Sequence, residues 1–422
     1  MRVYRLALLA SALLVPFAAV AVTPKEVREM AKAGQNAIPQ LQELLKDPDV
    51  DVRIEAVKQI TAIGSLRSLD PLILATADND PEVQIRSTDG LVNFYLPGYV
   101  QAGLSASLKR VGTGIKGKFT DTNDQVIDPY VMVRPEVVAA LGKLVRGGGT
   151  MEARANAARA IGILRGKAAV PDLLDAIHTK DSDVIYESLT ALQKIRDESA
   201  APRITFLLHD FDPKVQVAAI ETTGLLLNKQ AVPDLTDTLN RARDAKVRRA
   251  ALTAIAMLPA DGSRALYAKY LTDKDDKMRA AAAEGYGRLG NPADLPMLQM
   301  AWQDEGKTAP RLALAFAQVM LGKTELGEFT PLTTLINTLD TASYKDVAFA
   351  YLVELARDEK VRTALSGPLD TGTKDEKIGL ARVLARSGDK NSVAALQKLS
   401  NDPDPNVAQE GQRALRNLQA RL

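Results

Sequence analysis

A motif of about 31 residues recurs along almost the whole chain, and no other feature limits the possible folds so strongly. Its most regular part is an apolar residue followed by arginine and small residues, as in residues 52–57 (VRIEAV) and 278–283 (MRAAAA). We call the place of this arginine the register position. It is held in turn by Arg53, Arg86, Arg154, Ile185, Gln216, Arg248, Arg279, Arg311, Ala348, Lys377 and Ala408. Two steps, from 86 to 154 and from 311 to 348, are longer than the others.

Each unit is predicted to be a hairpin of two helices. The first half often begins with proline, which suits a first helical turn because its missing N–H has no partner there. A turn rich in Asp and Pro follows, and an Asp at this place can cap the next helix, as at Asp212-Pro213. The second half has apolar residues at helical spacing and commonly ends at glycine, as at Gly64, Gly166 and Gly290. One hairpin buries too little apolar surface to be stable alone, so neighbouring hairpins must stack into an α-solenoid.

The pattern Asp-Pro-x-Val-x-x-Arg-x-x-Ala-x-x-x-Leu-Gly resembles the HEAT repeat, in its short PBS-lyase HEAT-like form. Residues 157–164 and 285–290 follow it closely, and the resemblance covers residues 35–97 and 135–420. It implies an all-α fold, an armadillo-like α-α superhelix of roughly eleven hairpins whose second helices line the concave side. The family contains scaffolds, adaptors and a few enzymes, so the resemblance is specific for fold and leaves function open.

Residues 98–134 form an insertion between the second and third repeats. The first part of the insertion is rich in cations, and the second part is rich in acids and strand-forming residues. This order is compatible with a helix followed by a β-hairpin. An insertion in a repeat array often projects from the binding face, so this one either contacts a partner or is a passive elaboration that shields the second repeat. The cations expected to make the contacts are Lys109, Arg110, Lys116 and Lys118.

Residues 1–21 are predicted to be a secretory signal peptide. Arg2 and Arg5 precede an apolar stretch that ends in Ala19-Val20-Ala21, which gives a basic start, an apolar core and a small-x-small cleavage site. We expect cleavage after Ala21 and a periplasmic or secreted protein, whose solenoid occupies residues 22–422 and whose first helix, around residues 24–33, caps the N-terminal end. An uncleaved membrane anchor is the alternative, because about 17 apolar residues can just span a bilayer.

Composition excludes several classes of function. The chain has 54 Lys and Arg against 52 Asp and Glu. Two of those arginines lie in the predicted signal peptide, so the remainder carries no net charge and a nucleic-acid partner is not expected. Zero cysteines exclude disulfides, thiolate metal sites and Cys nucleophiles.

The two histidines do not form a metal site in our interpretation. His178 and His209 occupy equivalent places in adjacent units, and helices stacked at about 10 Å hold such side chains too far apart to share one Zn²⁺. Neither is followed by the Glu of the di-iron deoxyhypusine hydroxylases, which share the repeat. We therefore expect no metal, no cofactor and no catalytic residues.

Four units place an acid six residues before the register arginine. Such pairs belong either to a binding site or to a structural ladder that links successive repeats. Because they are spread along the whole array and cannot converge on one substrate, we interpret them as a structural ladder. The pairs are Asp47 with Arg53, Asp80 with Arg86, Asp273 with Arg279 and Glu305 with Arg311.

The second helices carry more cations than acids on the side predicted to face away from the core. Positions +5 and +9 from the register position lie on that side, at about 100° per residue. We interpret them as a basic concave face that accepts an acidic protein segment or an anionic polymer, with an ordinary solvated face as the alternative. The cations are Lys58, Arg159, Lys194, Arg288, Arg357, Arg382, Arg386 and Arg413, and the acids are Glu221 and Glu284.

The function that the sequence favours is a non-catalytic scaffold or adaptor of the bacterial envelope, which holds a protein partner of acidic character on its concave face. One alternative is a module that binds anionic glycan or lipid at a membrane surface without being an integral membrane protein. A second alternative is an enzyme related to the lyases and hydroxylases with this repeat, whose catalytic residues are lost or unrecognised.

Overall fold

The computed structural model describes residues 22–100 and 125–422, and this part of the chain is helical with no strand. Eleven helices, each holding one register position, pack on one another in chain order. We call them the inner layer. They are α3 (Val50–Ile63), α5 (Pro81–Tyr95), α8 (Met151–Ile163), α10 (Ser182–Ile195), α11 (Pro213–Leu225), α13 (Ala245–Met257), α15 (Asp276–Leu289), α17 (Thr308–Met320), α19 (Lys345–Leu355), α22 (Lys374–Ser387) and α24 (Pro405–Gln419). The predicted all-α solenoid of eleven hairpins is confirmed.

A second layer of shorter helices packs against the inner layer, one in most units. It comprises α2 (Ile38–Glu43), α4 (Leu69–Ala75), α7 (Pro135–Gly147), α9 (Val170–Ala176), the 3₁₀ helix η6 (Glu198–His209), α12 (Val232–Arg241), α14 (Arg264–Tyr270), α16 (Leu295–Asp304), α18 (Pro331–Asn337), α20 (Glu359–Ala364) with α21 (Ser366–Thr371), and α23 (Ser392–Leu399). The first helix, α1 (Pro24–Ala31), packs on α3 at the N-terminal end of the stack, where a capping helix was expected.

Aspartates and left-handed residues set the limits of the inner helices. The side chains of Asp49, Asp80 and Asp212 accept hydrogen bonds from the first free N–H groups of α3, α5 and α11. Gly64 and Gly290 end α3 and α15 in the left-handed conformation, as predicted. Gly166 was expected to do the same after α8, but its φ is −70°, and a neighbouring arginine takes the left-handed place instead.

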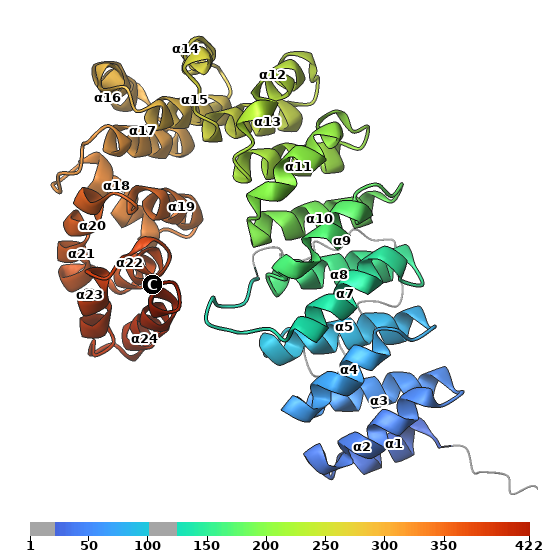
Figure 1. Cartoon of the computed structure of the whole chain (residues 1–422). Coiled ribbons are helices and arrows are strands. Elements are labelled where there is room, and N and C mark those ends of the chain that lie inside the picture. The colour runs from blue at the N-terminus through green and yellow to red at the C-terminus, as the bar shows by residue number, and fades with distance from the viewer. Residues whose placement is uncertain (1–21, 101–124) are drawn as a thin grey trace, which may run out of the picture.

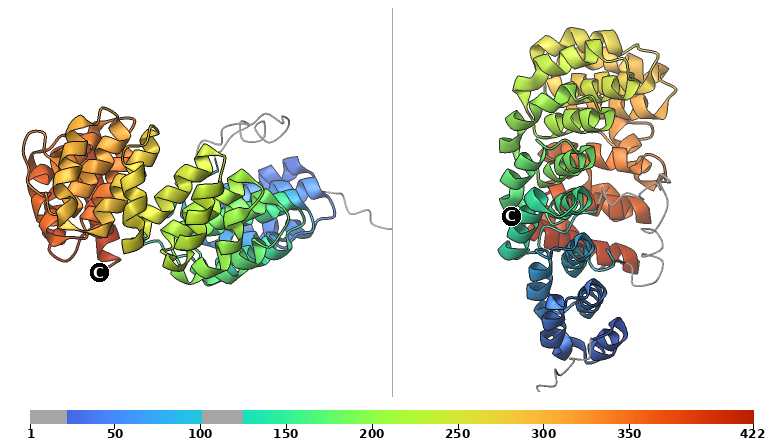
Figure 2. Two further views of the ribbon diagram at one scale, coloured as in Figure 1. Left: turned by 90° about the horizontal axis from the view of Figure 1, so that it is seen from above. Right: turned by 90° about the vertical axis from the view of Figure 1, so that its right-hand side faces the viewer.

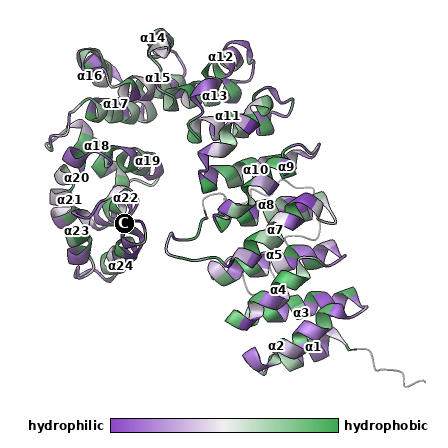
Figure 3. Cartoon of the chain, viewed as in Figure 1, coloured by the Kyte–Doolittle hydropathy of each residue, from purple (hydrophilic) through white to green (hydrophobic). Residues whose placement is uncertain are grey.

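Small residues let successive inner helices approach closely. Gly162, Gly224 and Gly287 share position +8 from the register position. A Cβ added at any of them would lie within 2.9 Å of the Cα of an alanine in the next inner helix. Apolar side chains fill the space between the two layers in one continuous core, and Figure 3 shows apolar and polar stretches on the same helices, as amphipathic packing requires.

The stack bends into an arc with two arms, which we call the N-terminal arm (α1 to α11) and the C-terminal arm (α18 to α24). From α13 to α24 the inner layer lies on the inside of the bend and α12, α14, α16, α20, α21 and α23 lie on the outside (Figure 1). The second view in Figure 2 also places the C-terminal helices beside the N-terminal arm. The described residues 125–134 extend from α7 toward α24 and contain no strand, so the predicted β-hairpin is not seen there, and residues 101–124 are outside the described part. None of the described helices has the length and apolarity needed to cross a bilayer.

Candidate functional site

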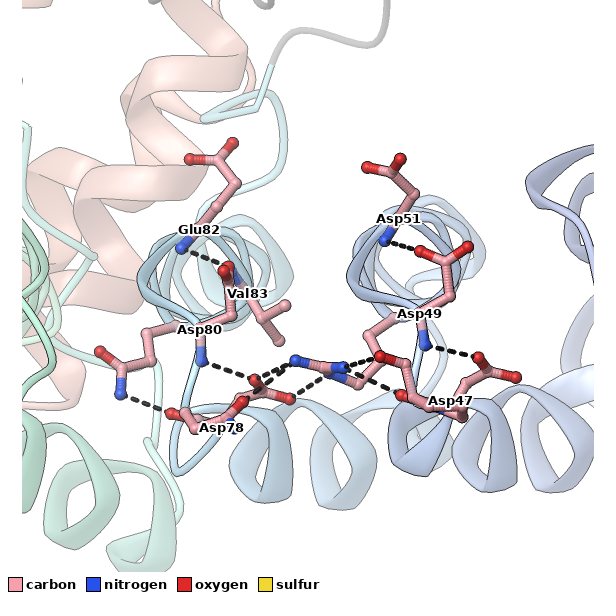
Figure 4. A network of polar contacts seen from close by, with 11 residues as sticks. Asp47, Asp49, Asp51, Asp78, Asp80, Glu82 and Val83 are labelled. Carbon is pink, nitrogen blue, oxygen red and sulfur yellow. Dashed lines mark hydrogen bonds and ion pairs between the residues drawn. The ribbon is translucent and has the colours of Figure 1, made fainter.

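The predicted structural ladder exists, but its carboxylates come from a different place in the repeat. Arg53 donates two hydrogen bonds to the carboxylate of Asp78, at 2.9 and 3.0 Å, and a third to the backbone oxygen of Asp47, six residues before it. The carboxylate of Asp47 instead accepts a hydrogen bond from the backbone N–H of Asp49. Figure 4 shows this network, with Asp47 and Asp49 in one turn and Asp78 and Asp80 in the next. Each rung therefore joins an arginine to the turn of the following unit.

The same geometry recurs at some predicted rungs and is missing at others. Arg279 donates to both carboxylate oxygens of Glu305, at 2.7 and 3.0 Å, and to the backbone oxygen of Asp273. The Asp80–Arg86 and Glu305–Arg311 rungs are not formed as expected, because Arg86 pairs with Glu82 on its own helix and Arg311 bonds only the backbone oxygens of Trp302 and Glu305. The sequence did not identify Arg362, which binds the Ala356 backbone oxygen and Asp389 in the same way as Arg53.

Arg288, predicted to be an exposed cation of the concave face, is buried in a network between two inner helices. Its guanidinium donates two hydrogen bonds of 2.8 Å to Glu354 of α19 and one of 2.9 Å to Glu284 of α15. Only 10% of the side chain is exposed, so the expectation of an exposed cation was wrong. Burial alone would lower the pKa of Arg288, but the two carboxylates outweigh it and raise this pKa. Tyr351 donates to Glu284 at 2.7 Å, which completes a link across the bend.

Other predicted cations of this face also have carboxylate partners. Arg159 pairs with Glu187, Lys58 with Glu55 and Arg382 with Glu410. Lys194 and Arg159 are partly buried, while Arg382 keeps half of its side chain exposed. These contacts neutralise part of the basic face.

The predicted acid Glu221 lies on α11 and is exposed. Nevertheless, the protein atoms around its carboxyl group reduce the hydration of that group, and this raises its pKa.

Two predicted cations, Arg357 and Arg386, are exposed and form no ion pair in the part of the chain that the structure describes. Arg357 directly follows the cap of α19, and Arg386 lies in the last turn of α22. The guanidinium of Arg386 lies over the ring of Phe349, with its central carbon 4.8 Å from the ring centre. Both belong to the C-terminal arm.

Two further arginines, Arg165 and Arg196, join them from the N-terminal arm. They follow α8 and α10 and have left-handed backbones, with φ of 49° and 60°. Both are exposed, and neither has an ion-pair partner among the described residues. Although Arg196 is exposed, the protein atoms around its guanidinium reduce its hydration and lower its pKa, and so does the charge of Arg165, Arg357 and Arg386. We call these four side chains the arginine cluster.

The arginine cluster was only half predicted. Arg165 and Arg196 stand eleven residues after their register positions, at the place where α3 and α15 have glycine. An arginine at the position where other units have a terminal glycine could have indicated these two residues. A prediction based only on the buried and exposed sides of the helix misses them, because they lie beyond the helix end. The predicted contacts Lys109, Arg110, Lys116 and Lys118 lie outside the described residues.

The end of the insertion joins the two arms. The backbone N–H of Ile127 donates to the oxygen of Ile163 at the end of α8, at 3.0 Å. The next residue, Asp128, accepts two hydrogen bonds of 2.9 Å from Arg413 and one of 3.2 Å from Asn417, both on α24. Burial would raise the pKa of Asp128, but these donors and the charge of Arg413 outweigh it and lower this pKa. Arg413 is thus another predicted cation with a carboxylate partner.

The histidines have no shared site. His178 follows α9 and stacks on Phe206 with ring centres 4.8 Å apart, and His209 is the last residue of η6. Within residues 22–100 and 125–422 there is no group of three or more His, Asp or Glu side chains placed to hold a metal ion.

Comparison with known protein families agrees with this architecture. The family model described as HEAT repeats matches residues 26–92, 138–222, 201–266 and 232–317, which together make up more than half of the chain. The chain belongs to the HEAT-repeat family. No curated protein matches this HEAT-repeat protein.

Three solved structures are similar to this chain at low identity. Human deoxyhypusine hydroxylase is 19% identical, with 68% of this chain and 96% of that one covered and a TM-score of 0.29. The CpcE–CpcF complex of phycocyanin lyase from Nostoc is 17% identical, with 74% and 99% covered and a TM-score of 0.30. Importin beta is 13% identical, with 92% and 57% covered and a TM-score of 0.40. Similarity at this level transfers no activity to this chain.

Proposed function

We propose that this HEAT-repeat protein is a non-catalytic scaffold of the bacterial envelope, which holds an acidic protein partner against its inner layer. HEAT solenoids commonly bind protein partners, and eleven stacked inner helices offer a long surface for many weak contacts. The observation that carries the proposal is the arginine cluster, whose four exposed cations follow or end inner helices and have no ion-pair partner in the described part of the chain. Unneutralised cations favour a partner of opposite charge.

Export is the second part of the proposal. It is supported by the basic start, apolar core and Ala-x-Ala end of residues 1–21, which lie outside the described residues. The mature protein would begin at Val22, two residues before α1. Mass spectrometry of the N-terminal peptide in the periplasmic fraction tests this directly. A chain that keeps residues 1–21 and sediments with membranes would contradict it.

The scaffold role is tested by capturing the partner with charge-reversed variants. We expect Arg357→Glu with Arg386→Glu to reduce the recovery of crosslinked envelope proteins at least about fivefold, because the inner charge changes sign. The matched control is Arg203→Glu with Arg241→Glu, two exposed arginines of the outer layer that give the same change in net charge. Equal recovery by both variants would contradict a role of the inner layer. Recovery of glycan or lipid alone would favour an anionic polymer instead of a protein.

A further inference from the structure

The backbone at Arg165 and Arg196 is held in a conformation that arginine rarely adopts. A left-handed residue at a helix end is usually glycine, because a Cβ there crowds the following carbonyl group. Glycine holds the equivalent place at Gly64, Gly290 and Gly322, and the equivalent Leu227 is left-handed as well, with φ of 55°, so the repeat itself imposes this conformation. The surrounding repeat maintains this backbone, and it therefore fixes the point from which the two arginine side chains extend.

The end of the insertion links the place of Arg165 to the opposite arm. Ile127 bonds to the end of α8 two residues before Arg165, and Asp128 bonds to Arg413 of α24. Consecutive residues are about 3.8 Å apart. The end of α8 and the Arg413 side chain of α24 are therefore joined through two consecutive residues, Ile127 and Asp128. Arg386 belongs to α22, which packs directly on α24. Figure 1 shows the same arrangement, with α22 and α24 facing α8 and α10.

The four cations repel one another in the free protein. Arg165, Arg357 and Arg386 all lower the pKa of Arg196, and Arg165 also lowers the pKa of Arg386 after the larger effect of burial. Arginine stays charged at any physiological pH, so the repulsion cannot be relieved by losing a proton. An anion bound among the four side chains would relieve it. The carboxylate of Asp128 already acts in this direction on Arg165 and Arg386.

The arrangement of donors favours several spaced carboxylates over one compact anion. Each guanidinium presents a fork of N–H groups that fits a carboxylate, and the four forks come from the ends of four different helices in two arms. A segment with acidic side chains at several positions can reach forks on both arms. We propose that the arginine cluster is a carboxylate-binding site for an acidic peptide segment that contacts both arms at once. This inference rests on the proposed function and specifies its ligand.

The probe is a fluorescein-labelled octaglutamate peptide, whose binding to the purified chain without residues 1–21 is followed by fluorescence anisotropy. We expect Arg165→Gly with Arg196→Gly, and separately Arg357→Gln with Arg386→Gln, to weaken binding at least tenfold each. Glycine suits the left-handed conformation, so the first variant should keep or raise its melting temperature. The control Arg203→Gln with Arg241→Gln should bind like the original protein.

The proposal is overturned if variants of only one arm weaken binding, or if no variant does. It is also overturned if tripolyphosphate or phosphatidylglycerol vesicles compete for the same arginines with higher affinity than the peptide. Capture of the native partner by crosslinking tests the scaffold role independently of the carboxylate-binding site. Partner capture that depends on Arg357 and Arg386 while octaglutamate binding does not would refute only the carboxylate site. Peptide binding without any effect on partner capture would refute the scaffold role.

Discussion

At the scale of single residues, several charged side chains with little exposure hold neighbouring units together. Arg53 and Arg279 each bind the backbone of one turn and the carboxylate of the next, with little exposure of the side chains involved. Charge-assisted contacts of this kind fix the angle between neighbouring units because a guanidinium fork accepts only one orientation of the carboxylate. The four arginines of the cluster have no such carboxylate partner among the described residues.

Glu305 gives a residue-scale prediction with a dependence on pH. Its bonds from Arg279 lower its pKa, more than burial raises it. Such a carboxylate contributes stability above its unfolded pKa of about 4.3, and this contribution is lost as pH falls through the folded value. Glu305→Gln should therefore lower the free energy of unfolding by about 1–2 kcal/mol at pH 7, and by progressively less below about pH 4.

Urea unfolding at several pH values measures this difference. The control is Glu328→Gln, an exposed glutamate in the loop after α17 that should leave stability unchanged at every pH. A constant difference between Glu305→Gln and the original protein down to pH 3 would show that the ion pair does not stabilise this rung.

Sequence periodicity predicts the side of a helix but not the partner of a charged residue. It correctly placed Arg357 and Arg386 among exposed residues, because helical spacing alone separates exposed from buried positions. It failed for Arg288, whose partner Glu354 is 66 residues away in the chain and lies on another inner helix. For the ladder, the sequence pattern pairs each arginine with the acid six residues before it. In the structure, Arg53 and Arg279 instead pair with an acid in the turn of the following unit.

At the scale of elements, inner helices touch through positions that have almost no side chain. Gly287 of α15 faces Ala317 of α17, and Gly162 and Gly224 repeat the contact in other units. The elements themselves could be predicted, because caps and proline are local signals. An exception is residues 198–209, where Pro202 lies inside a 3₁₀ helix instead of opening an α-helix. Close approach between units is a property of pairs, so one unit's sequence does not reveal it.

Gly287→Ala tests this packing. Its Cβ would lie 2.7 Å from the Cα of Ala317, so backbone must shift and we expect a loss of about 1–3 kcal/mol in unfolding free energy. The control is Gly147→Ala at the end of α7, where an added Cβ meets nothing within 4 Å and stability should not fall. Thermal unfolding of both variants gives the comparison. Equal stability would mean that α15 and α17 can separate without cost.

At the scale of the whole molecule, one contact joins parts of the chain that are 285 residues apart. The segment that makes it is also fixed at its other end, where Arg134 pairs with Asp70 at 2.9 Å and its N–H donates to the hydroxyl of Tyr95. Repeat count and insertion length were visible in the sequence, but the bend that brings α24 to Asp128 accumulates from small rotations between units. No local pattern encodes that sum.

Asp128→Ala should release this contact and loosen the C-terminal arm. We expect hydrogen exchange in α24 and residues 125–134 to accelerate about tenfold, which corresponds to about 1.4 kcal/mol, while α13 is unaffected. Asp183→Ala, which removes the exposed pair with Lys214 between neighbouring units, is the control and should leave α24 unchanged. Unchanged exchange in α24 of Asp128→Ala would show that the arm is held by neighbouring helices alone.

The bond between Asp128 and Arg413 also limits how this protein can change in length. Solenoids usually tolerate the gain or loss of a unit, because each unit contacts only its neighbours. Here, duplication or deletion of one hairpin between α10 and α22 would move α24 by about 10 Å, the thickness of one helix, and the carboxylate would no longer reach it. The tertiary structure therefore depends on the number of repeats. Variants with one hairpin more or fewer would fold as solenoids in which the contact between Asp128 and Arg413 is missing.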